Sequence, residues 1–503
     1  MSLLAIDMGS SSCKAMAIAV DGRILAEHSY SYSPEIPHPS WAQMPAGEFC
    51  KALACVTRKL SDLASQDPVE VLAISSHAET FVPVDFRLQP VGPAILNTDK
   101  RAVEQATWVA ETLGPNRIFE ITGLTAHPMY PVPKILWMRE NQPDIFKSAA
   151  KFLSVVDYLL THLGLPPCID FSHASRFLAF DIRKKRWSAD ILDACELTAD
   201  RFATPVPAGT LAGSLTSQVA NDLGLRPGTP VVVGGHDQPC SALGLGVLDP
   251  GRVSASLGTY ECLLSTAETP PLNDTAFHAN LNISCHVVPN RYATIAYFPS
   301  GIMLEWFLQL LHEGRADTTS VGDVCTALEA RVPDGPTGLL VVPHLLGTCN
   351  PDFNPQATGV MVGLRPEMRA AHIYKGILEG VACELSAMTE LLQRVTGSFQ
   401  DLFVSGGGCR SQLGLQLRAA LTGCRLHQTR CPEAVCLGTA ILAGVGAGKY
   451  SGFPEAIAQL VQVTATIHPD RKMADDYHRQ LQQYRQVYSS LAGVREPQAT
   501  KIS

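Results

Sequence analysis

Short apolar runs separated by glycine, serine and aspartate turns open the chain. Leu3 to Ile6 and Met16 to Val20 each suit a buried strand, and the Asp21-Gly22 turn leads into a third run, Ile24 to Tyr32. This pattern predicts a meander of three strands. Its first loop, within Asp7 to Ala15 (DMGSSSCKA), offers backbone N–H groups and hydroxyls to an anion, and a carboxylate at its mouth can hold magnesium. A plain β-turn is an equally good interpretation of so short a motif.

A similar arrangement returns about 250 residues later. Val253 to Leu264 (VSASLGTYECLL) places Gly258 and Thr259 between two strand-like segments, which suggests an internal duplication. It resembles the arrangement of actin-like ATPases, in which two related α/β domains hold a nucleotide between their hairpins. A third glycine loop, Phe403 to Gln412 (FVSGGGCRSQ), ends an apolar strand and opens a helix near Ser411, so a helix N-terminus can face a phosphate. The dinucleotide and P-loop fingerprints are both missing from these loops.

The stretch from Val231 to Gly246 (VVVGGHDQPCSALGLG) carries the strongest candidate for chemistry. Its β-branched start predicts a buried strand, and we expect Gly234 and Gly235 to turn the chain tightly where that strand ends. Asp237 would then be presented at a strand end, a good position for a general base. The alternative is an aspartate that caps the following helix.

Composition narrows the class of protein. A chain of 503 residues exceeds one ordinary core and predicts two large domains, and 46% apolar with 17% charged residues is typical of a compact soluble protein. The net charge is −8 and the basic residues are scattered, which argues against a nucleic-acid or membrane partner and favours a small one. With no leader or membrane-length apolar run, we expect a cytoplasmic location. The 15 cysteines lack a CxxC pair and suit reduced core thiols.

Five segments in order resemble the FGGY carbohydrate kinases, the family of glycerol kinase, xylulokinase and gluconokinase. Met129 to Asn141 (MYPVPKILWMREN) fits the first family signature, and Gly359 to Gly380 fits the second except that Gly376 replaces the usual Ala or Ser. The first loop resembles the family's phosphate loop, with Ser10 for the common Thr. The segments containing Asp237 and the third glycine loop resemble the family's catalytic-base and nucleotide-binding segments.

This resemblance implies roles by position. Asp237 would be the catalytic base that takes the proton from a substrate hydroxyl as it attacks the γ-phosphate of ATP, and Asp7 and Asp237 would flank Mg²⁺. Phosphates and nucleoside would be held by Ser10, Ser11, Gly258, Thr259, Gly407, Gly408 and Gln412. Phosphoryl transfer needs mainly positioning and charge neutralisation, which these groups can supply.

The sugar side is implied by two loops of the N-terminal half. His77 and Glu79, in ISSHAETFVPVD, match the Gln of the family's substrate loop and its His or Glu, whereas Ala78 stands where glycerol kinase has a substrate-contacting Arg. In PAILNTDKR, Asn97 replaces a Trp, Asp99 and Arg101 match the family, and these two can simply pair with each other. Gln238 matches a residue that contacts substrate hydroxyls. Trp41 is expected to pack, with the sugar pocket as the alternative.

The expected fold is α/β, with two actin-like (ribonuclease H-like) ATPase domains and a central interdomain cleft. We place the sugar-binding domain at residues 1–246 and the nucleotide-binding domain at 247–503, and expect helices within Ile377 to Val395 and Pro432 to Gly446 to cover the nucleotide sheet. The implied function is ATP- and Mg²⁺-dependent phosphorylation of a ketose, polyol or sugar acid. The alternatives are a nucleotide-binding regulator and a catalytically retired sugar sensor. A homodimer is frequent in the family, but no residue predicts one.

Overall fold

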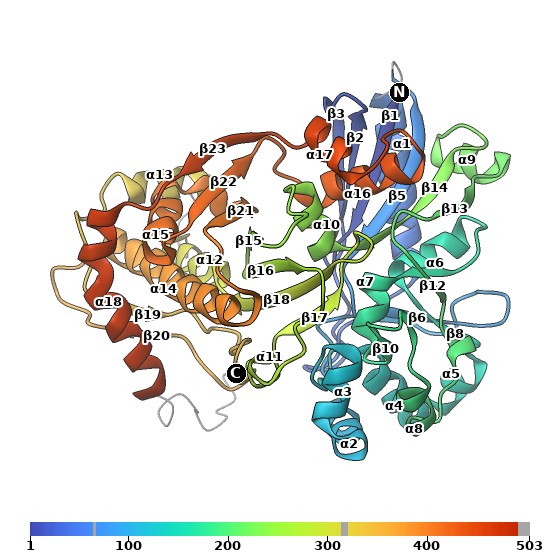
Figure 1. Ribbon diagram of the computed structural model, residues 1–503, viewed down its shortest axis with the longest axis horizontal. Coiled ribbons are helices and arrows are strands. Elements are labelled where there is room, and N and C mark those ends of the chain that lie inside the picture. Colours follow the sequence, from blue (N-terminus) through green and yellow to red (C-terminus); the bar gives the residue numbers. More distant parts are fainter. Residues whose placement is uncertain (64–66, 313–319, 491–503) are drawn as a thin grey trace.

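The computed structural model describes residues 1–63, 67–312 and 320–490, and two mixed sheets organise it (Figure 1). The first sheet, in spatial order, contains β13 (Leu211–Ser214), β14 (Pro230–His236), β5 (Val69–Ser76), β1 (Ser2–Met8), β2 (Ser12–Ala19) and β3 (Ile24–Ser31). The second contains β17 (Asn282–Cys285), β18 (Tyr292–Pro299), β16 (Tyr260–Ala267), β15 (Arg252–Leu257), β21 (Asp401–Ser405), β22 (Arg425–Thr429) and β23 (Val463–Ile467).

The central strands of the two sheets share one topology. In the first, β1 pairs antiparallel with β2 and parallel with β5, which in turn pairs parallel with β14. In the second, β15 pairs antiparallel with β16 and parallel with β21, which pairs parallel with β22. Each sheet then ends in an antiparallel edge strand, β13 or β23. The predicted meander and internal duplication are therefore confirmed.

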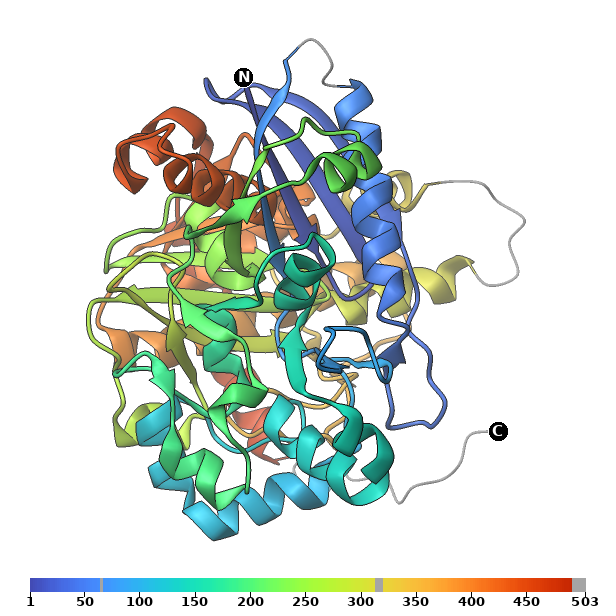
Figure 2. The ribbon, with the colours of Figure 1, turned by 90° about the vertical axis from the view of Figure 1, so that its right-hand side faces the viewer.

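Amphipathic helices cover the outer faces of these sheets. Figure 2 shows α1 (Gly47–Leu63) along the first sheet, where its buried stripe Phe49, Leu53, Val56 and Leu60 packs over β2 and β3. On the second sheet, α14 (Ala370–Thr396) packs against β16 and β18, as predicted. Helices α12 (Gly301–His312), α15 (Gln412–Thr422) and α18 (Arg471–Ser490) pack around α14 or its neighbours. Within the described ranges, every helix is too short or too polar to cross a membrane.

A smaller lobe is inserted into the first half, at the lower right of Figure 1. Its sheet consists of β4 (Gln43–Met44), β7 (Ala94–Ile95), β6 (Phe81–Val84) and β8 (Lys151–Ser154). Its helices are α2 (Val103–Leu113), α3 (Pro115–Thr122), α4 (Pro131–Asn141), α5 (Pro143–Ser148) and α6 (Val155–His162). This lobe carries the two loops expected to bind sugar.

The other elements connect these layers. They are β9 (Cys168–Asp170), α7 (Phe171–Ala174), the 3₁₀ turns Ser175–Phe177, Ala199–Arg201 and Gly407–Arg410, β10 (Phe180–Asp181), β11 (Arg186–Trp187), α8 (Ala189–Ala194), β12 (Thr204–Val206), α9 (Ser217–Leu223), α10 (Asp237–Gly244), α11 (Asp274–His278), α13 (Val321–Glu329), β19 (Leu340–Val342), β20 (Val360–Val362), α16 (Ala434–Gly446) and α17 (Phe453–Leu460).

The expectation that α16 covers the nucleotide sheet is wrong. This helix packs against β1, β5 and β14 of the first sheet, and its Leu437 and Ile441 share a core with Leu3 and Val232. So much of the surface of α16 is apolar that hydrophobic periodicity alone does not show which of the two sheets the helix covers. Residues from the second half thus return to the first sheet, and the expected division between residues 246 and 247 stays a prediction.

Glycines explain how closely α16 meets α10. A Cβ on Gly438 would lie 1.8 Å from the carbonyl oxygen of Cys240, and one on Gly244 would lie 1.9 Å from that of Ala434. The two helix backbones therefore touch where side chains would hold them apart. Since α10 begins at Asp237, this packing fixes the helix that carries the candidate base.

The expected tight turn at Gly234 and Gly235 is also wrong. Strand β14 continues through both glycines to His236, and its register against β5 shifts between Val233 and His236. A Cβ on Gly234 would lie 2.0 Å from the carbonyl oxygen of Ile74, so the glycine permits a bulge in close contact with β5.

Candidate active site

Three parallel strands of the first sheet end at the same edge, and each brings polar groups there. Asp7 of β1 lies opposite Ser75 of β5, and His236 at the end of β14 lies opposite Ser76. Because ligands in open α/β sheets bind at the carboxyl ends of parallel strands, this edge is the natural position for a site. The predicted pair Asp7 and Asp237 therefore meets at one place.

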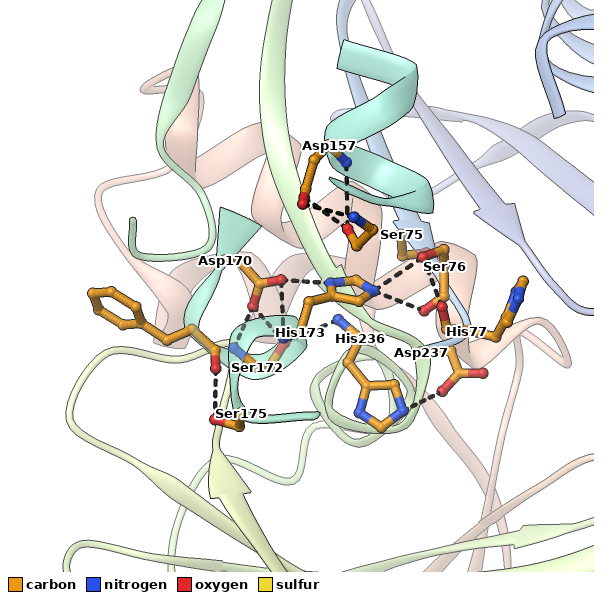
Figure 3. A network of polar contacts seen from close by, with 12 residues as sticks. Ser75, Ser76, His77, Asp157, Asp170, Ser172, His173, Ser175, His236 and Asp237 are labelled. Atoms are coloured by element: carbon orange, nitrogen blue, oxygen red, sulfur yellow. Dashed lines mark hydrogen bonds and ion pairs between the residues drawn. The ribbon is translucent and has the colours of Figure 1, made fainter. Parts of the chain in front are cut away.

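Asp237 is the first residue of α10, and its Oδ1 lies 3.0 Å from His236 Nε2 (Figure 3). The N-cap position of α10 is occupied by His236 and not by Asp237, so the alternative of a helix cap is not supported. Burial on its own would raise the pKa of this carboxyl, but the imidazoles of His236, His77 and His173 outweigh it and lower the pKa. Asp237 is therefore ionised at neutral pH, as a general base must be.

Asp7 lies in a different electrostatic setting. Burial and then the charge of Asp237 raise its pKa to about 8. Its Oδ1 is buried and, among the described residues, has no hydrogen-bond partner. A bound cation would offset the repulsion between Asp7 and Asp237 and favour the ionised form of both, so the pair fits Mg²⁺, which proteins usually hold through one or two carboxylates, waters and substrate phosphates. Over the described ranges, no cluster of three or more His, Cys, Asp or Glu residues forms a complete metal cage.

The first predicted phosphate loop is a tight connection between β1 and β2. Gly9 donates its N–H to the carbonyl oxygen of Ser12 at 2.9 Å, and the Tyr32 hydroxyl donates to the carbonyl oxygen of Gly9 at 2.5 Å. Ser10 is half-buried and Ser11 is exposed. The protein thus fixes the loop through its carbonyl groups, while the serine side chains reach the surface beside Asp7.

The equivalent loop of the second sheet is Gly258-Thr259, between β15 and β16. It abuts the start of α12, where Gly301 donates its N–H to the carbonyl oxygen of Gly258 at 3.1 Å. Thr259 is exposed and its hydroxyl donates to Glu305 at 3.1 Å. The two hairpin loops thus occupy corresponding positions in the duplicated sheets.

The third glycine loop leads from β21 to α15. Gly406 has a φ of +91°, and a Cβ on Gly408 would lie 2.8 Å from Leu257 Cβ, whereas a Cβ on Gly407 would meet nothing within 4 Å. Gln412 is the exposed first residue of α15, after Ser411 caps the helix. Gly407 and Gln412 therefore have open space beside them, while Gly408 is needed for packing on β15.

On the sugar side, Glu79 forms a buried ion pair that sequence analysis missed. Arg176 Nε donates to Glu79 Oε1 at 2.5 Å, and the guanidinium lies 5.3 Å from the ring centroid of Tyr130. Burial would raise the pKa of Glu79, but Arg176 lowers it below its ordinary value. Glu79 also has a φ of +62°, a rare conformation that side chains keep only when their surroundings impose it.

Lys134 of the first signature joins the two predicted sugar loops. Its ammonium is fully buried and donates to the carbonyl oxygens of Leu96 at 2.7 Å and Glu79 at 3.2 Å. Burial lowers its pKa to about 7. Lys134 thus connects the two loops through hydrogen bonds in the protein interior.

Asp99 and Arg101 pair with each other. Both side chains are 0% exposed, and Arg101 Nη2 donates to Asp99 Oδ2 at 2.8 Å. The guanidinium lies 4.4 Å from the ring centroid of Trp41 and 4.9 Å from that of Trp137. Trp41 therefore packs, as expected, and Asp99 is engaged by its arginine, so its substrate role stays a prediction.

The three other residues predicted to bind sugar differ in whether their polar atoms already have hydrogen-bond partners. His77 has both ring nitrogens occupied, by the Met8 carbonyl oxygen at 2.8 Å and the Thr80 hydroxyl at 2.7 Å. Asn97 Oδ1 is buried and lacks a hydrogen-bond partner within the described part of the chain. Gln238 is half-buried in the first turn of α10. Asn97 and Gln238 are the better placed to receive a ligand.

Sequence analysis also missed the segment that positions these groups, Asp170 to Arg176 (DFSHASR). It supplies Arg176 to Glu79 and, through Ser172, a hydrogen bond to the N–H of His236. The only local signal was a run of polar residues between apolar stretches, which does not reveal its partners.

Comparison with known proteins gives the family context. Residues 2–244 match the N-terminal domain and residues 253–447 the C-terminal domain of the FGGY family of carbohydrate kinases. Gluconokinase of Bacillus subtilis (strain 168) is 25% identical over 509 residues, covering 100% of this chain and 97% of the relative. Xylulose kinase of the same organism is 27% identical over 497 residues, covering 97% and 96%.

Solved structures share the fold. A xyloylose kinase from Brucella ovis superposes with a TM-score of 0.88 at 23% identity, covering 98% of this chain and 100% of that one. Plasmodium falciparum glycerol kinase with ADP gives a TM-score of 0.85 at 19% identity, with 99% of each chain covered. The predicted fold of two actin-like α/β ATPase domains is confirmed.

Proposed function

Because the chain belongs to the FGGY family of carbohydrate kinases, we propose that it transfers the γ-phosphoryl group of ATP to a hydroxyl of a small neutral ketose or polyol. The observation that carries this proposal is Asp237, a carboxylate held at the converging strand ends with its pKa lowered by neighbouring imidazoles. A base in that state can accept the substrate's hydroxyl proton at neutral pH.

Each part of the site has a task in this reaction. Asp237 takes the proton from the attacking hydroxyl, and Ser10, Ser11, Gly258, Thr259 and Gly407 line the path of the phosphates. Asp7 and Asp237 would hold Mg²⁺, which supplies charge neutralisation on the phosphate oxygens. Closure of the two domains would exclude water as a competing acceptor.

The charges of the sugar side support a neutral substrate over a sugar acid. Arg176 is paired with Glu79 and Arg101 with Asp99, and burial lowers the pKa of Lys134 to about 7. A substrate carboxylate entering beside Asp7 and Asp237 would need an unpaired cation, because an uncompensated buried charge is costly. Hydroxyls can instead donate to Asn97 Oδ1 and accept from the buried Arg176 Nη1, neither of which has a partner among the described residues.

The departure at Gly376 has a packing explanation. A Cβ at this position would lie 2.9 Å from Leu339 Cδ1 and 3.1 Å from Leu339 Cβ. The glycine thus fits the contact between α14 and β19 and gives no support to a retired enzyme.

The test is ADP release with ATP and Mg²⁺ across pentuloses, hexuloses, polyols and sugar acids. We expect turnover with a neutral ketose or polyol and a loss of roughly 10²–10⁴-fold in Asp237→Asn, the usual worth of a general base. ATP binding, measured by calorimetry, should persist in that variant. Turnover of gluconate but no neutral sugar would overturn the substrate class. ATP binding without turnover of any compound would favour the regulator or retired sensor.

A further inference from the structure

One buried carboxylate, Asp170, connects three elements behind the candidate base (Figure 3). It lies at the end of β9 and caps α7, accepting the N–H of Ser172 at 2.7 Å and that of His173 at 3.3 Å. Its Oδ2 also accepts the hydroxyl of Ser172, and its Oδ1 lies 2.6 Å from His173 Nδ1. The Asp170 oxygens accept hydrogen bonds from these neighbours, so His173 Nδ1 carries a proton.

The second ring nitrogen of His173 carries a proton too. Nε2 lies 3.2 Å from the carbonyl oxygen of Ser76, which can only accept, and 3.0 Å from the Ser76 hydroxyl. That hydroxyl donates its own proton to the carbonyl oxygen of His77 at 2.9 Å, so it accepts from the imidazole. Protons on both nitrogens make His173 an imidazolium, although its side chain is 1% exposed.

Ser172 extends the cluster to β14. Its hydroxyl accepts the N–H of His236 at 2.9 Å while donating to Asp170. A Cβ placed on Gly235 would lie 3.2 Å from the Ser172 hydroxyl, so the bulge that precedes Asp237 packs closely against Ser172. The same carboxylate thereby ties the end of β5, through His173 and Ser76, and the end of β14, through Ser172.

The charged and titratable groups around His173 come from every neighbouring element. Asp170 precedes it on β9, Asp157 lies on α6, His77 follows β5, and His236 and Asp237 end β14 and begin α10. Burial would lower the pKa of His173, but Asp170 first and then Asp157 and Asp237 raise it. The net direction agrees with the protons inferred from hydrogen bonding.

We propose that Asp170 and His173 are positioning residues for the transfer reaction: a buried, hydrogen-bonded imidazolium–carboxylate pair that fixes the strand ends presenting Asp237. Neither residue belongs to the loops predicted to bind sugar or phosphate. It holds the backbone of His236, and through it the direction of the Asp237 carboxylate, while placing a positive charge behind that carboxylate. This inference rests on the proposed role of Asp237 as base.

The protonation state can be tested without an activity assay. In protein with ¹⁵N-labelled histidine, His173, assigned by its loss in His173→Asn, should give two protonated ring nitrogens at pH 7. A neutral tautomer at pH 7 would overturn the proposal. Because this spectrum needs no substrate, it separates failure of this inference from failure of the proposed kinase function.

Kinetics test the positioning role. Ser172→Ala removes the link to His236 with little change in volume, and we expect kcat to fall by ~10–100-fold, the usual effect of losing a supporting contact to a reactive group. The KM values for sugar and ATP should change less than threefold. His173→Asn, which keeps one donor, should retain more kcat than His173→Leu.

The matched control is Ser386→Ala. Ser386 lies within α14, which packs on the second sheet; it is also buried and donates one hydrogen bond to the carbonyl oxygen of Leu421. If Ser172→Ala keeps the kcat of this control, or if its kcat falls only in proportion to the folded fraction measured by circular dichroism, Asp170 and His173 have a structural role only and the proposal is wrong.

Discussion

On the predicted sugar side of the site, Glu79, Arg176, Asp99 and Arg101 are buried and joined in ion pairs, whereas on the predicted nucleotide side Gly407, Thr259 and Gln412 are exposed. Glu79 and Arg176 are 97 residues apart, whereas Asp99 and Arg101 pair within one loop. The second set, on the predicted nucleotide side, is placed by the local backbone of a hairpin or of a helix start. The two halves share a central strand topology, but their predicted ligand-binding groups differ in burial.

This difference agrees with what each half is proposed to recognise. Sugars differ in the arrangement of similar hydroxyls, so discrimination requires side chains fixed in direction and matched in charge. A triphosphate presents the same charged oxygens every time, so backbone N–H groups and a helix start suffice. Variants on the sugar side should therefore affect stability and turnover together, and variants on the nucleotide side should affect ATP affinity alone.

The largest effect is expected from Arg176→Met. It leaves the Glu79 carboxylate buried without its cation, which typically costs ~3–5 kcal/mol of folding free energy. Sugar kcat/KM should fall by at least ~100-fold, as for other losses of a buried charged contact. Urea denaturation and steady-state kinetics measure the two effects.

The control is Arg117→Met, which breaks an ion pair with Asp190 whose side chains are 59% and 57% exposed. Such exposed pairs are worth ~0–1 kcal/mol. If both variants unfold at the same urea concentration, Arg176 is not the buried support described here.

Lys134→Met should change how stability depends on pH. The pKa of Lys134 is about 7 when folded and near 10.5 when unfolded, so between these values the unfolded chain binds more protons and stability rises with pH. The lysine contributes a slope of up to ~1.4 kcal/mol per pH unit. Denaturant midpoints from pH 7 to pH 10 should therefore rise less steeply in the variant. Identical slopes would show that the lysine titrates normally.

A pair of glycine variants probes the nucleotide side. Gly407→Ala adds a Cβ with nothing within 4 Å, whereas Gly408→Ala places one 2.8 Å from Leu257 Cβ. We expect Gly407→Ala to keep its thermal midpoint but raise the KM for ATP by ~10-fold, because the methyl group blocks close approach of a phosphate. Gly408→Ala should lose stability. An unchanged KM for ATP in Gly407→Ala would show that Gly407 does not lie against the bound nucleotide.

Gln412→Ala should give the smallest effect. The side chain is exposed at the first position of α15, so folding free energy should stay within ~0.5 kcal/mol of the parent. The KM for ATP should rise about threefold, the size of one weak hydrogen bond, while the KM for sugar is unchanged. A change in the KM for sugar instead would contradict the assignment to the nucleotide side.

Much of the fold could be predicted because its signals are local. The hairpins around Ser10 and Gly258, the strand before Asp237 and the helix after Ser411 each follow from a short apolar run and its turn residues. The order of these motifs also indicated the duplicated sheets and the family. The roles of the individual site residues stay predictions.

The sequence did not correctly predict how the elements pack against one another. Helix α16 has an apolar face that fits either sheet, and close backbone contact at Gly438 selects the first. The glycines before Asp237 suggested a turn, but they form a bulge because β5 approaches too closely for a side chain.

The sequence by itself determined the elements, their order and the candidate base, because hydrophobic periodicity and turn chemistry act within a few residues. Only the tertiary structure decided which charges meet. Glu79 and Arg176 are 97 residues apart, as are Ser76 and His173, and no local pattern encodes either pair. A buried charge is tolerated only beside its partner, and that partner is brought near only when the whole chain folds.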